Sequence, residues 1–248
     1  MHSGRMSALV PAYVLHRRAF RDSSLILELY TLSHGRVGAV ARGARRPGSR
    51  WRALVEPFQP LLSSWQGRGE LMTLTALEAA GPPQTVAGPR LASAFYVNEL
   101  MLRLLRREDP SEALFEAYAQ VISGLSRNDA EEACLRLFEK RLLECLGYGL
   151  QLERAADTGA PLEPNRHYRY VIDYGPVCAD RGERDVFSGR CLLALGREEM
   201  QSGIELGAIR RLMRIALEPH IGDRPLHSRG LYRQLRGRKT GPQGESRS

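Results

Sequence analysis

The hydrophobic period of this chain changes once, across a stretch rich in proline and glycine at residues 81–89, GPPQTVAGP. Before this stretch, apolar residues alternate with polar ones in short runs, a period typical of β-strands. After it, they recur at intervals of three and four, as in amphipathic helices. The stretch itself has the composition of a linker. The sequence therefore predicts an α+β protein, with a β domain over residues 1–80, a helical domain over 81–236 and a disordered polar tail over 237–248.

Five short strands are predicted in the β domain. They cover residues 12–16, 25–30, 36–42, 54–65 and 70–78. Pro57 and Pro60 interrupt the fourth, which suits an edge or bulged strand because proline cannot donate to the ladder. Five strands joined by turns fit a small closed barrel, and the leading candidate is the five-stranded oligonucleotide-binding fold (OB-fold). A barrel of the SH3 type is compatible with the same pattern.

Three amphipathic helices with short connections are predicted after the linker, and they should pack as a bundle. The first ends by Arg107. The second is expected to begin with Asp109 as its N-cap, because a proline and then a glutamate follow at suitable positions. Asn128 or Asp129 should cap the third helix, which should stop at Gly147.

Residues 148–200 lack a clear period and are predicted to be an irregular insertion that carries a small β-hairpin near residues 168–172. The helical period returns over residues 205–217, and Pro219 should end that helix. Ser228 is expected to cap a last short helix.

The most basic stretch covers residues 35–52, GRVGAVARGARRPGSRWR, and holds six arginines and no acid. Gly43 and Pro47 break regular structure and should leave arginines on a mobile loop, beside Trp51. Such a loop suits a phosphate backbone and a stacked base, whereas a merely solvated basic loop is the alternative. The candidate DNA-binding residues are Arg36, Arg42, Arg45, Arg46, Arg50 and Arg52, with Arg68 from the following turn.

The whole chain is basic, with a formal net charge of +8, which favours an acidic partner. Its only lysines are Lys140 and Lys239, and arginine offers planar, bidentate contacts to phosphate. A second basic region, residues 210–239, has nine basic and two acidic residues. Within it Arg210, Arg211 and Arg214 lie along one helical face, so they are candidates to extend a DNA path. Solvated helix faces are the alternative.

No catalytic or metal-binding pattern is found. The six histidines have no HxH or HExxH spacing, the four cysteines form no CxxC pair, and no phosphate loop or GxSxG elbow is present. Arginines interrupt the early apolar residues, so no signal peptide is predicted, and no apolar run approaches a membrane span. We therefore expect a cytoplasmic binding protein without enzymatic activity, cofactor or metal. An RNA-binding OB-fold protein and a nuclease with an unrecognised site are the alternatives.

Seven segments, taken in their order and spacing, resemble the RecO family of bacterial recombination mediators. They are VLHRRAFRDSSLILELYTLSHGR (14–36), ARGARR (41–46), EPFQPLL (56–62), GRGEL (67–71), YVNELMLRLL (96–105), LRLFEKRLLECLGYG (135–149) and RPLHSRGLYRQL (224–235). The resemblance covers nearly the whole chain. It implies an N-terminal OB-fold, a helical domain and no catalytic centre.

The resemblance also implies partners. Proteins of this family bind single- and double-stranded DNA, anneal complementary strands and, with RecR, help to load RecA onto DNA coated by the single-stranded DNA-binding protein (SSB). A protein of this kind would be associated with the nucleoid. Some members carry a four-cysteine zinc site near residues 150–190, but this chain keeps only Cys178 and Cys191 there, so we expect no zinc and a hairpin held by packing.

The helical domain of the family is further implied to hold the acidic C-terminal tail of SSB. Such a tail needs an apolar groove with a cation at its rim. The family position that contacts the tail carboxylate matches Arg136, and the apolar contacts would come from Leu135, Phe138 and Leu142. The alternative is that the cations of this helix merely make ion pairs at helical spacing, Arg136 with Glu132 or Lys140 with Glu144.

Overall fold

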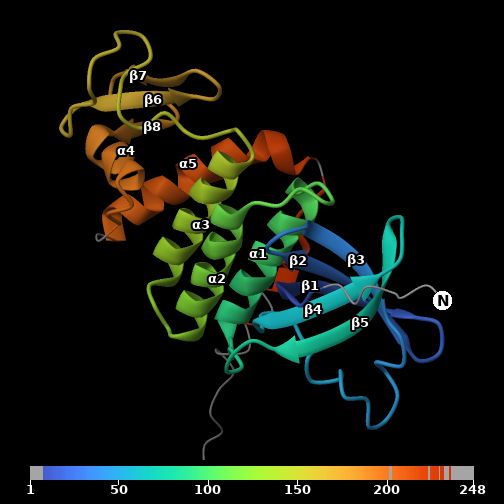
Figure 1. Ribbon diagram of the computed structural model, residues 1–248. Coiled ribbons are helices and arrows are strands. Elements are labelled where there is room, and N and C mark those ends of the chain that lie inside the picture. The colour runs from blue at the N-terminus through green and yellow to red at the C-terminus, as the bar shows by residue number, and fades with distance from the viewer. Residues whose placement is uncertain (1–7, 201–202, 223, 229, 232–234, 236–248) are drawn as a thin grey trace, which may run out of the picture. The chain divides into compact units, whose positions relative to one another are not determined.

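A computed structural model describes residues 8–200, 203–222, 224–228, 230–231 and 235 (Figure 1). The chain forms two compact units. Of the described residues, one unit contains 8–115, 125–127 and those from 224 onward, and the other contains 116–124 and those from 128 to 222. The predicted disordered tail, 237–248, lies outside the described residues. No helix among the described residues is long and apolar enough to cross a membrane.

The first unit is built on a closed five-stranded barrel (Figure 1). Its strands are β1 (Val10–Phe20), β2 (Ser24–Thr31), β3 (Gly35–Ala41), β4 (Leu61–Gln66) and β5 (Leu71–Ala79). They follow the order β1-β2-β3-β5-β4, in which only the β3–β5 pair is parallel. A closed five-stranded barrel followed by helices confirms the predicted α+β class with an N-terminal OB-fold.

The barrel core is filled by inward-facing residues of every strand, among them Val14, Leu27, Leu29, Leu61 and Leu74. Burial of these apolar side chains stabilises the barrel, because each removes apolar surface from water. The predicted fourth strand was too long at its start: β4 begins only at Leu61, and the residues before it form turns. The two prolines that precede β4 explain the difference, because neither has an N–H to donate to a ladder.

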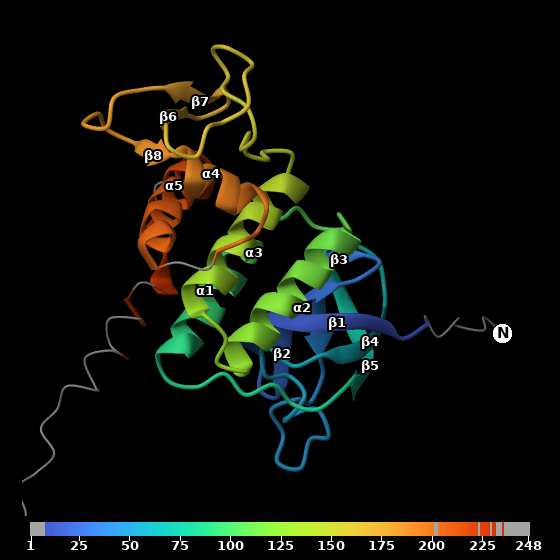
Figure 2. The same cartoon turned by 90° about the vertical axis from the view of Figure 1, so that its left-hand side faces the viewer.

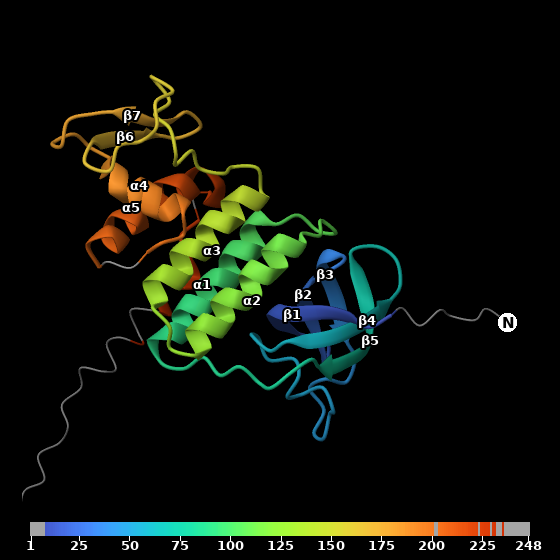
Figure 3. The same cartoon turned by 60° about the vertical axis from the view of Figure 1, so that its left-hand side comes forward.

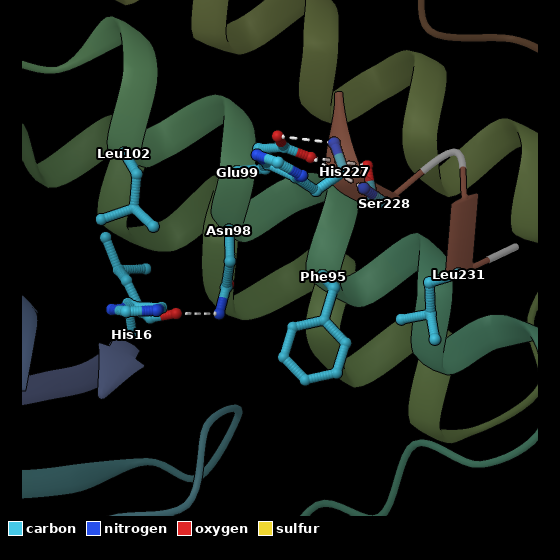
Figure 4. Close-up of a pocket in the computed structure, with 9 residues that line it drawn as sticks. His16, Phe95, Asn98, Glu99, Leu102, His227, Ser228 and Leu231 are labelled. Atoms are coloured by element: carbon cyan, nitrogen blue, oxygen red, sulfur yellow. Dashed lines mark hydrogen bonds between the residues drawn. The ribbon is translucent and has the colours of Figure 1, made fainter. Parts of the chain in front are cut away.

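Helix α1 (Pro89–Leu104) packs against β1 in the same unit. The register of β1 against β2 slips between Val14 and His16. There the Asn98 side chain donates a hydrogen bond to the carbonyl oxygen of Leu15 at 2.7 Å, so this buried amide is satisfied (Figure 4). A cavity of about 540 Å³ lies beside this contact and is lined by residues of β1 and α1 together with His227, Ser228 and Leu231.

A carboxylate of α1 caps the segment that begins at His227, which corrects the expected role of Ser228. The Glu99 carboxylate accepts hydrogen bonds from the backbone N–H groups of His227, at 2.9 Å, and Ser228, at 3.0 Å (Figure 4). It also accepts one from the Ser228 hydroxyl at 2.8 Å. His227 and Ser228 are already helical, so a distant acid and not Ser228 satisfies the free N–H groups.

The predicted helices α2 (Glu112–Ser126) and α3 (Glu131–Cys145) are present, but their N-caps differ from the prediction. Ser111, not Asp109, caps α2, because its hydroxyl accepts from the Leu114 N–H at 3.2 Å. Helix α3 begins after Ala130 without a side-chain cap. Asn128 has φ 64 and belongs to the turn that separates the helices. The C-terminal end at Gly147 is as expected.

The insertion is more regular than predicted. It contains a three-stranded antiparallel sheet of β6 (His167–Val171), β7 (Gly175–Cys178) and β8 (Val186–Ser188), followed by α4 (Gly189–Gly196). Two tyrosine hydroxyls hold the preceding loop to β6: Tyr168 accepts from the Glu163 N–H at 2.9 Å and Tyr170 from the Gln151 N–H at 3.0 Å. Burial raises the pKa of Tyr170 to about 12. These two hydrogen bonds add to the strand pairing of the sheet.

Helix α5 (Gly203–Ile221) follows and packs against α3 and α4 within the second unit. Pro219 was expected to end this helix, but it lies inside the last turn. The helix continues two residues further and gives way at Gly222, which has φ 74. A left-handed glycine is therefore the actual stop signal.

Candidate nucleic-acid interface

Five of the predicted arginines lie on the segment between β3 and β4, which extends from one end of the barrel (Figures 2 and 3). They are Arg42, Arg45, Arg46, Arg50 and Arg52, and all are exposed. The segment is held by successive backbone hydrogen bonds, including Arg46 N–H to Gly43 at 3.1 Å and Ser49 N–H to Arg46 at 3.1 Å. The arginines therefore stand on a series of turns.

Trp51 has a different role from the one expected. Its side chain is buried in the barrel core beside Ala44 and Val55, so it does not present a ring to a base. Instead it anchors the arginine-bearing segment to the barrel. The Arg50 guanidinium lies 5.3 Å from the Trp51 ring centroid, within reach of a cation–π interaction.

The structure adds two arginines that the sequence analysis missed. The Arg45 N–H bonds to the Ser23 carbonyl at 2.9 Å, and Arg45 Nη1 donates to the Arg21 carbonyl at 3.3 Å. The basic segment is thereby tied to the β1–β2 turn. Arg21 in this turn and Arg18 near the end of β1 are also exposed. Arg17, next to them, is paired with Glu56 at 2.6 Å.

We call the combined set the barrel-end basic surface. It consists of Arg18, Arg21, Arg42, Arg45, Arg46, Arg50 and Arg52. The sequence signal for Arg18 and Arg21 is the basic segment RRAFRD, residues 17–22. On the sequence alone, its arginines counted only as evidence against a signal peptide. Because β1 and β2 form a hairpin, the end of β1 and the residues after β3 meet at the same edge of the barrel.

Arg36 is not part of this surface. Its side chain is only 17% exposed, and its Nη1 donates to the carbonyl oxygens of Leu102, at 2.6 Å, and Leu105, at 2.9 Å. Burial lowers the pKa of Arg36, partly offset by Glu28, whose carboxylate lies 3.5 Å from Nε. A cation that satisfies the last carbonyls of a helix stabilises its C-terminal end, so Arg36 holds α1 to the barrel.

Arg68 is exposed and belongs to the turn between β4 and β5. This turn lies at the other end of the barrel (Figure 1). Strand β5 runs parallel to β3, with Leu71 opposite Gly38. The turn before β5 therefore lies near the start of β3, whereas Arg42 follows its end. A seven-residue strand spans roughly 20 Å, so the structure does not bring Arg68 together with the other arginines.

The predicted basic face of α5 also contains both exposed arginines and one that is bound within the protein. Arg210 and Arg214 are exposed, and Arg210 Nε is 3.8 Å from Glu132. Arg211 is committed to β8: it donates to the Val186 carbonyl at 2.8 Å, and its guanidinium lies 4.8 Å from the Phe187 ring centroid. Arg211 thus fastens the insertion sheet to α5.

The residues predicted to bind an acidic tail are placed in the interior. Leu135, Phe138 and Leu142 are buried core residues of α3. Arg136 is 8% exposed and donates to Glu139, which has no exposure, at 2.8 Å, with Glu132 at 3.8 Å on its other side. The alternative pairing of Arg136 with Glu132 is therefore present, and the Arg136 side chain is almost fully buried. The helical period marks the buried face of α3 but does not reveal that an ion pair is buried with it.

Two further cations of α3 hold a carboxylate that follows α4. Glu198 accepts hydrogen bonds from Lys140 Nζ at 3.1 Å, Arg141 Nε at 3.1 Å and Arg141 Nη2 at 2.5 Å. The hydrogen bonds from Arg141, and then those from Lys140, hold the pKa of Glu198 below its ordinary value. Lys140 also pairs with Glu144 at 2.9 Å.

The described residues contain no group of three or more histidines, cysteines or acids that could hold a metal ion. Of the two cysteines in the insertion, Cys178 is exposed at the end of β7 and Cys191 is buried within α4.

Comparisons with known proteins agree with this architecture. The family model "Recombination protein O N terminal" matches residues 6–83, and "Recombination protein O C terminal" matches residues 87–230. The DNA repair protein RecO of Alkalilimnicola ehrlichii is 51% identical over 237 residues, which is 94% of each chain. The DNA repair protein RecO of Nitrosococcus oceani is 46% identical over 230 residues, covering 92% of this chain and 94% of that relative. The chain therefore belongs to the RecO family of DNA repair and recombination proteins.

Proposed function

We propose that this protein binds single- and double-stranded DNA through the barrel-end basic surface and anneals complementary strands. The observation that carries the proposal is the gathering of seven exposed arginines at one end of an OB-fold barrel, with no ion pair to any of them among the described residues. Guanidinium groups without a carboxylate partner are available to phosphates, whereas Arg36 and Arg211 are occupied by the protein itself.

The mechanism follows from charge. Arginines that neutralise phosphates lower the repulsion between two strands, so bases can find their partners without nucleotide hydrolysis. Contacts with the backbone and not with base edges leave the activity independent of sequence. With Trp51 buried, binding at this surface depends on charge more than on stacking. On this basis the protein is a mediator without catalytic activity.

We further propose that the protein works with RecR to load RecA onto single-stranded DNA covered by SSB. The helical region would hold the acidic tail of SSB, in the neighbourhood of α3. The family-model matches to residues 6–83 and 87–230 support a functional division into an OB-fold domain at 1–80 and a helical domain at 81–236. Such a protein would act in the cytoplasm, at the nucleoid.

Titration of labelled single-stranded DNA at several salt concentrations tests DNA binding. Replacing Arg42, Arg45 and Arg46 with alanine should weaken binding to all sequences and reduce the log–log salt slope by about 0.7 for each phosphate that is no longer neutralised. A matched control replaces three exposed insertion arginines: Arg181, Arg184 and Arg190. It removes the same charge from the insertion. Equal slopes for the two triple variants would place the DNA elsewhere.

The same titration with RNA of matching sequence separates the proposed function from that of an RNA-binding OB-fold protein. DNA is expected to bind at least as tightly as RNA, because backbone contacts do not require a 2′-hydroxyl. A clear preference for RNA would favour the alternative.

A further inference from the structure

The cavity between β1 and α1, within the first unit, is held open by the backbone of β1 (Figure 4). The register of this strand slips between Val14 and His16, and the Leu15 carbonyl accepts the hydrogen bond from Asn98 of α1 at 2.7 Å. An irregularity of this kind bends a strand and redirects its side chains. Because the Asn98 side chain is buried, its hydrogen bond fixes the strand and the helix relative to each other beside the cavity.

The third wall, formed by the segment that contains His227 and Ser228, is also fastened to α1. Glu99 accepts hydrogen bonds from the backbone N–H groups of His227 and Ser228. Arg103 Nη2 donates to the Pro225 carbonyl at 2.8 Å. The walls are therefore in place before any ligand arrives, and a preformed site loses less conformational entropy on binding than one that must be ordered.

The lining of the cavity is mainly apolar. It consists of the side chains of Leu15, Phe95, Leu102 and Leu231, with the imidazoles of His16 and His227 and the polar side chains of α1 beside them (Figure 4). The volume of about 540 Å³ lies within the range of roughly 300–1,000 Å³ that is usual for small-molecule sites. Glu99 is the one acid among the described lining residues, and both of its oxygens already accept hydrogen bonds from the protein. The cavity therefore suits an apolar ring with polar edges.

Cations lie next to the cavity on two of its walls. His16 is exposed, and Arg18 lies two residues further along β1, on the same side of the strand because side chains alternate. Arg18 belongs to the barrel-end basic surface, so this surface continues along β1 to the cavity. On the opposite wall, Arg224 is exposed three residues before His227. A polyanion that follows these arginines would carry any rings attached to it past the cavity.

We propose that this cavity receives an unstacked nucleobase of single-stranded DNA that is bound along the barrel-end basic surface. The inference rests on the proposed function and adds a subsite to it. A base in a single strand is free to enter, whereas a base in a duplex must first unpair. The cavity thus favours single strands, which the charge of the arginines does not do. Because every base has an apolar face, the subsite leaves binding independent of sequence.

Fluorescence anisotropy of the full chain with two labelled strands tests the subsite. One strand is a short oligothymidine, and the other has the same length and phosphates but abasic sugars. The ratio of their dissociation constants therefore reports the bases alone, and for the parent the abasic strand should bind on the order of tenfold more weakly. Leu102→Trp fills the cavity with an indole and should bind both strands equally. The matched control is Leu71→Trp, at an exposed leucine that begins β5, and it should keep the ratio of the parent.

A second variant decides the matter if Leu102→Trp does not fold, which cooperative thermal unfolding would show. His16→Ala changes an exposed residue at the cavity and should lower the ratio by about threefold. If the parent binds both strands equally, or if folded Leu102→Trp and His16→Ala keep the ratio of the parent, the cavity receives no base. Only the present inference is then overturned, and an apolar side chain of a protein partner becomes the better occupant. If the parent binds neither strand, the proposed DNA binding itself is wrong.

Discussion

The arginines at the end of the barrel and the cations of α3 share a chemistry but differ in their neighbours. Residues 35–52 contain no acid, and within the described residues Arg42, Arg46 and Arg52 make no ion pair. On α3, by contrast, Arg136, Lys140 and Arg141 each hold a carboxylate. The first set is available to a polyanion as it stands. The second must release or share an internal partner before it can bind anything else.

Net charge alone does not show which arginines can bind a partner and which stabilise the fold. A surface ion pair between exposed side chains contributes only about 0–1 kcal/mol, so such a pair can be exchanged for a partner's phosphate or carboxylate. A buried pair cannot, because breaking it leaves an uncompensated charge in the interior. The burial of each guanidinium therefore decides whether it serves binding or stability.

The largest expected effect on stability comes from Arg136, the most deeply paired cation of α3. Arg136→Ala should lower the free energy of unfolding by about 3 kcal/mol or more, because it removes the cation that faces the fully buried Glu139. Urea denaturation followed by circular dichroism measures the change. The double variant Arg136→Leu with Glu139→Leu should recover much of the loss, since it removes both charges and keeps apolar volume. A loss below about 0.5 kcal/mol for Arg136→Ala would contradict the assignment of a buried structural pair.

Within the barrel, Arg36 should behave like the cations of α3 and not like its neighbours in sequence. Arg36→Ala should cost about 1–3 kcal/mol of stability, because the carbonyls of Leu102 and Leu105 lose their donor. It should leave the salt slope of DNA binding unchanged. Arg46→Ala should do the opposite, with little effect on stability and a flatter slope. If both variants change both quantities equally, Arg36 also reaches phosphate.

Much of this could be predicted from the sequence, because it depends on local periodicity. Alternation over residues 25–30 predicted β2, and the apolar stripe after residue 112 predicted α2. The partners of Arg36 could not be predicted, since they are backbone carbonyls 66 and 69 residues away. Helix α4 was missed because its eight residues hold too few turns for a period to show.

The helix cap at His227 and the position of Trp51 could not be predicted for the same reason, because both depend on tertiary structure. Glu99 caps a segment 128 residues later, and no local pattern announces such a partner. Trp51 sits between two arginines in sequence, yet the turns around it direct the ring into the core. The sequence shows which arginines are able to bind phosphate. Only the tertiary structure shows which of these guanidinium groups are already bound to groups of the protein itself.

A smaller effect is expected when acid removes the charge of Glu198. Hydrogen bonds from Arg141 and Lys140 hold its pKa below the ordinary value of 4.5. Because the folded pKa is lower than the unfolded one, the stabilisation is complete above pH 4.5 and is lost as the pH falls through the lowered pKa. Glu198→Gln should therefore be less sensitive to acid than Glu199→Gln, by less than about 1 kcal/mol, in acid titrations followed by circular dichroism. Identical acid midpoints would show that the Glu198 pair contributes nothing measurable.

The finest test concerns Arg18, near the end of β1, and Arg21, in the β1–β2 turn, which both belong to the barrel-end basic surface. Arg18→Ala with Arg21→Ala should reduce the salt slope for single-stranded DNA by about 1.4, two phosphates at about 0.7 each. Arg17→Ala is the internal control, because its guanidinium is already paired with Glu56 at 2.6 Å and its removal should change the slope less than that of either neighbour. Titrations over a roughly fourfold range of salt resolve this difference. If Arg17→Ala flattens the slope as much as Arg18→Ala does, an existing ion pair does not withhold an arginine from DNA, and the contrast between the barrel end and α3 rests on burial alone.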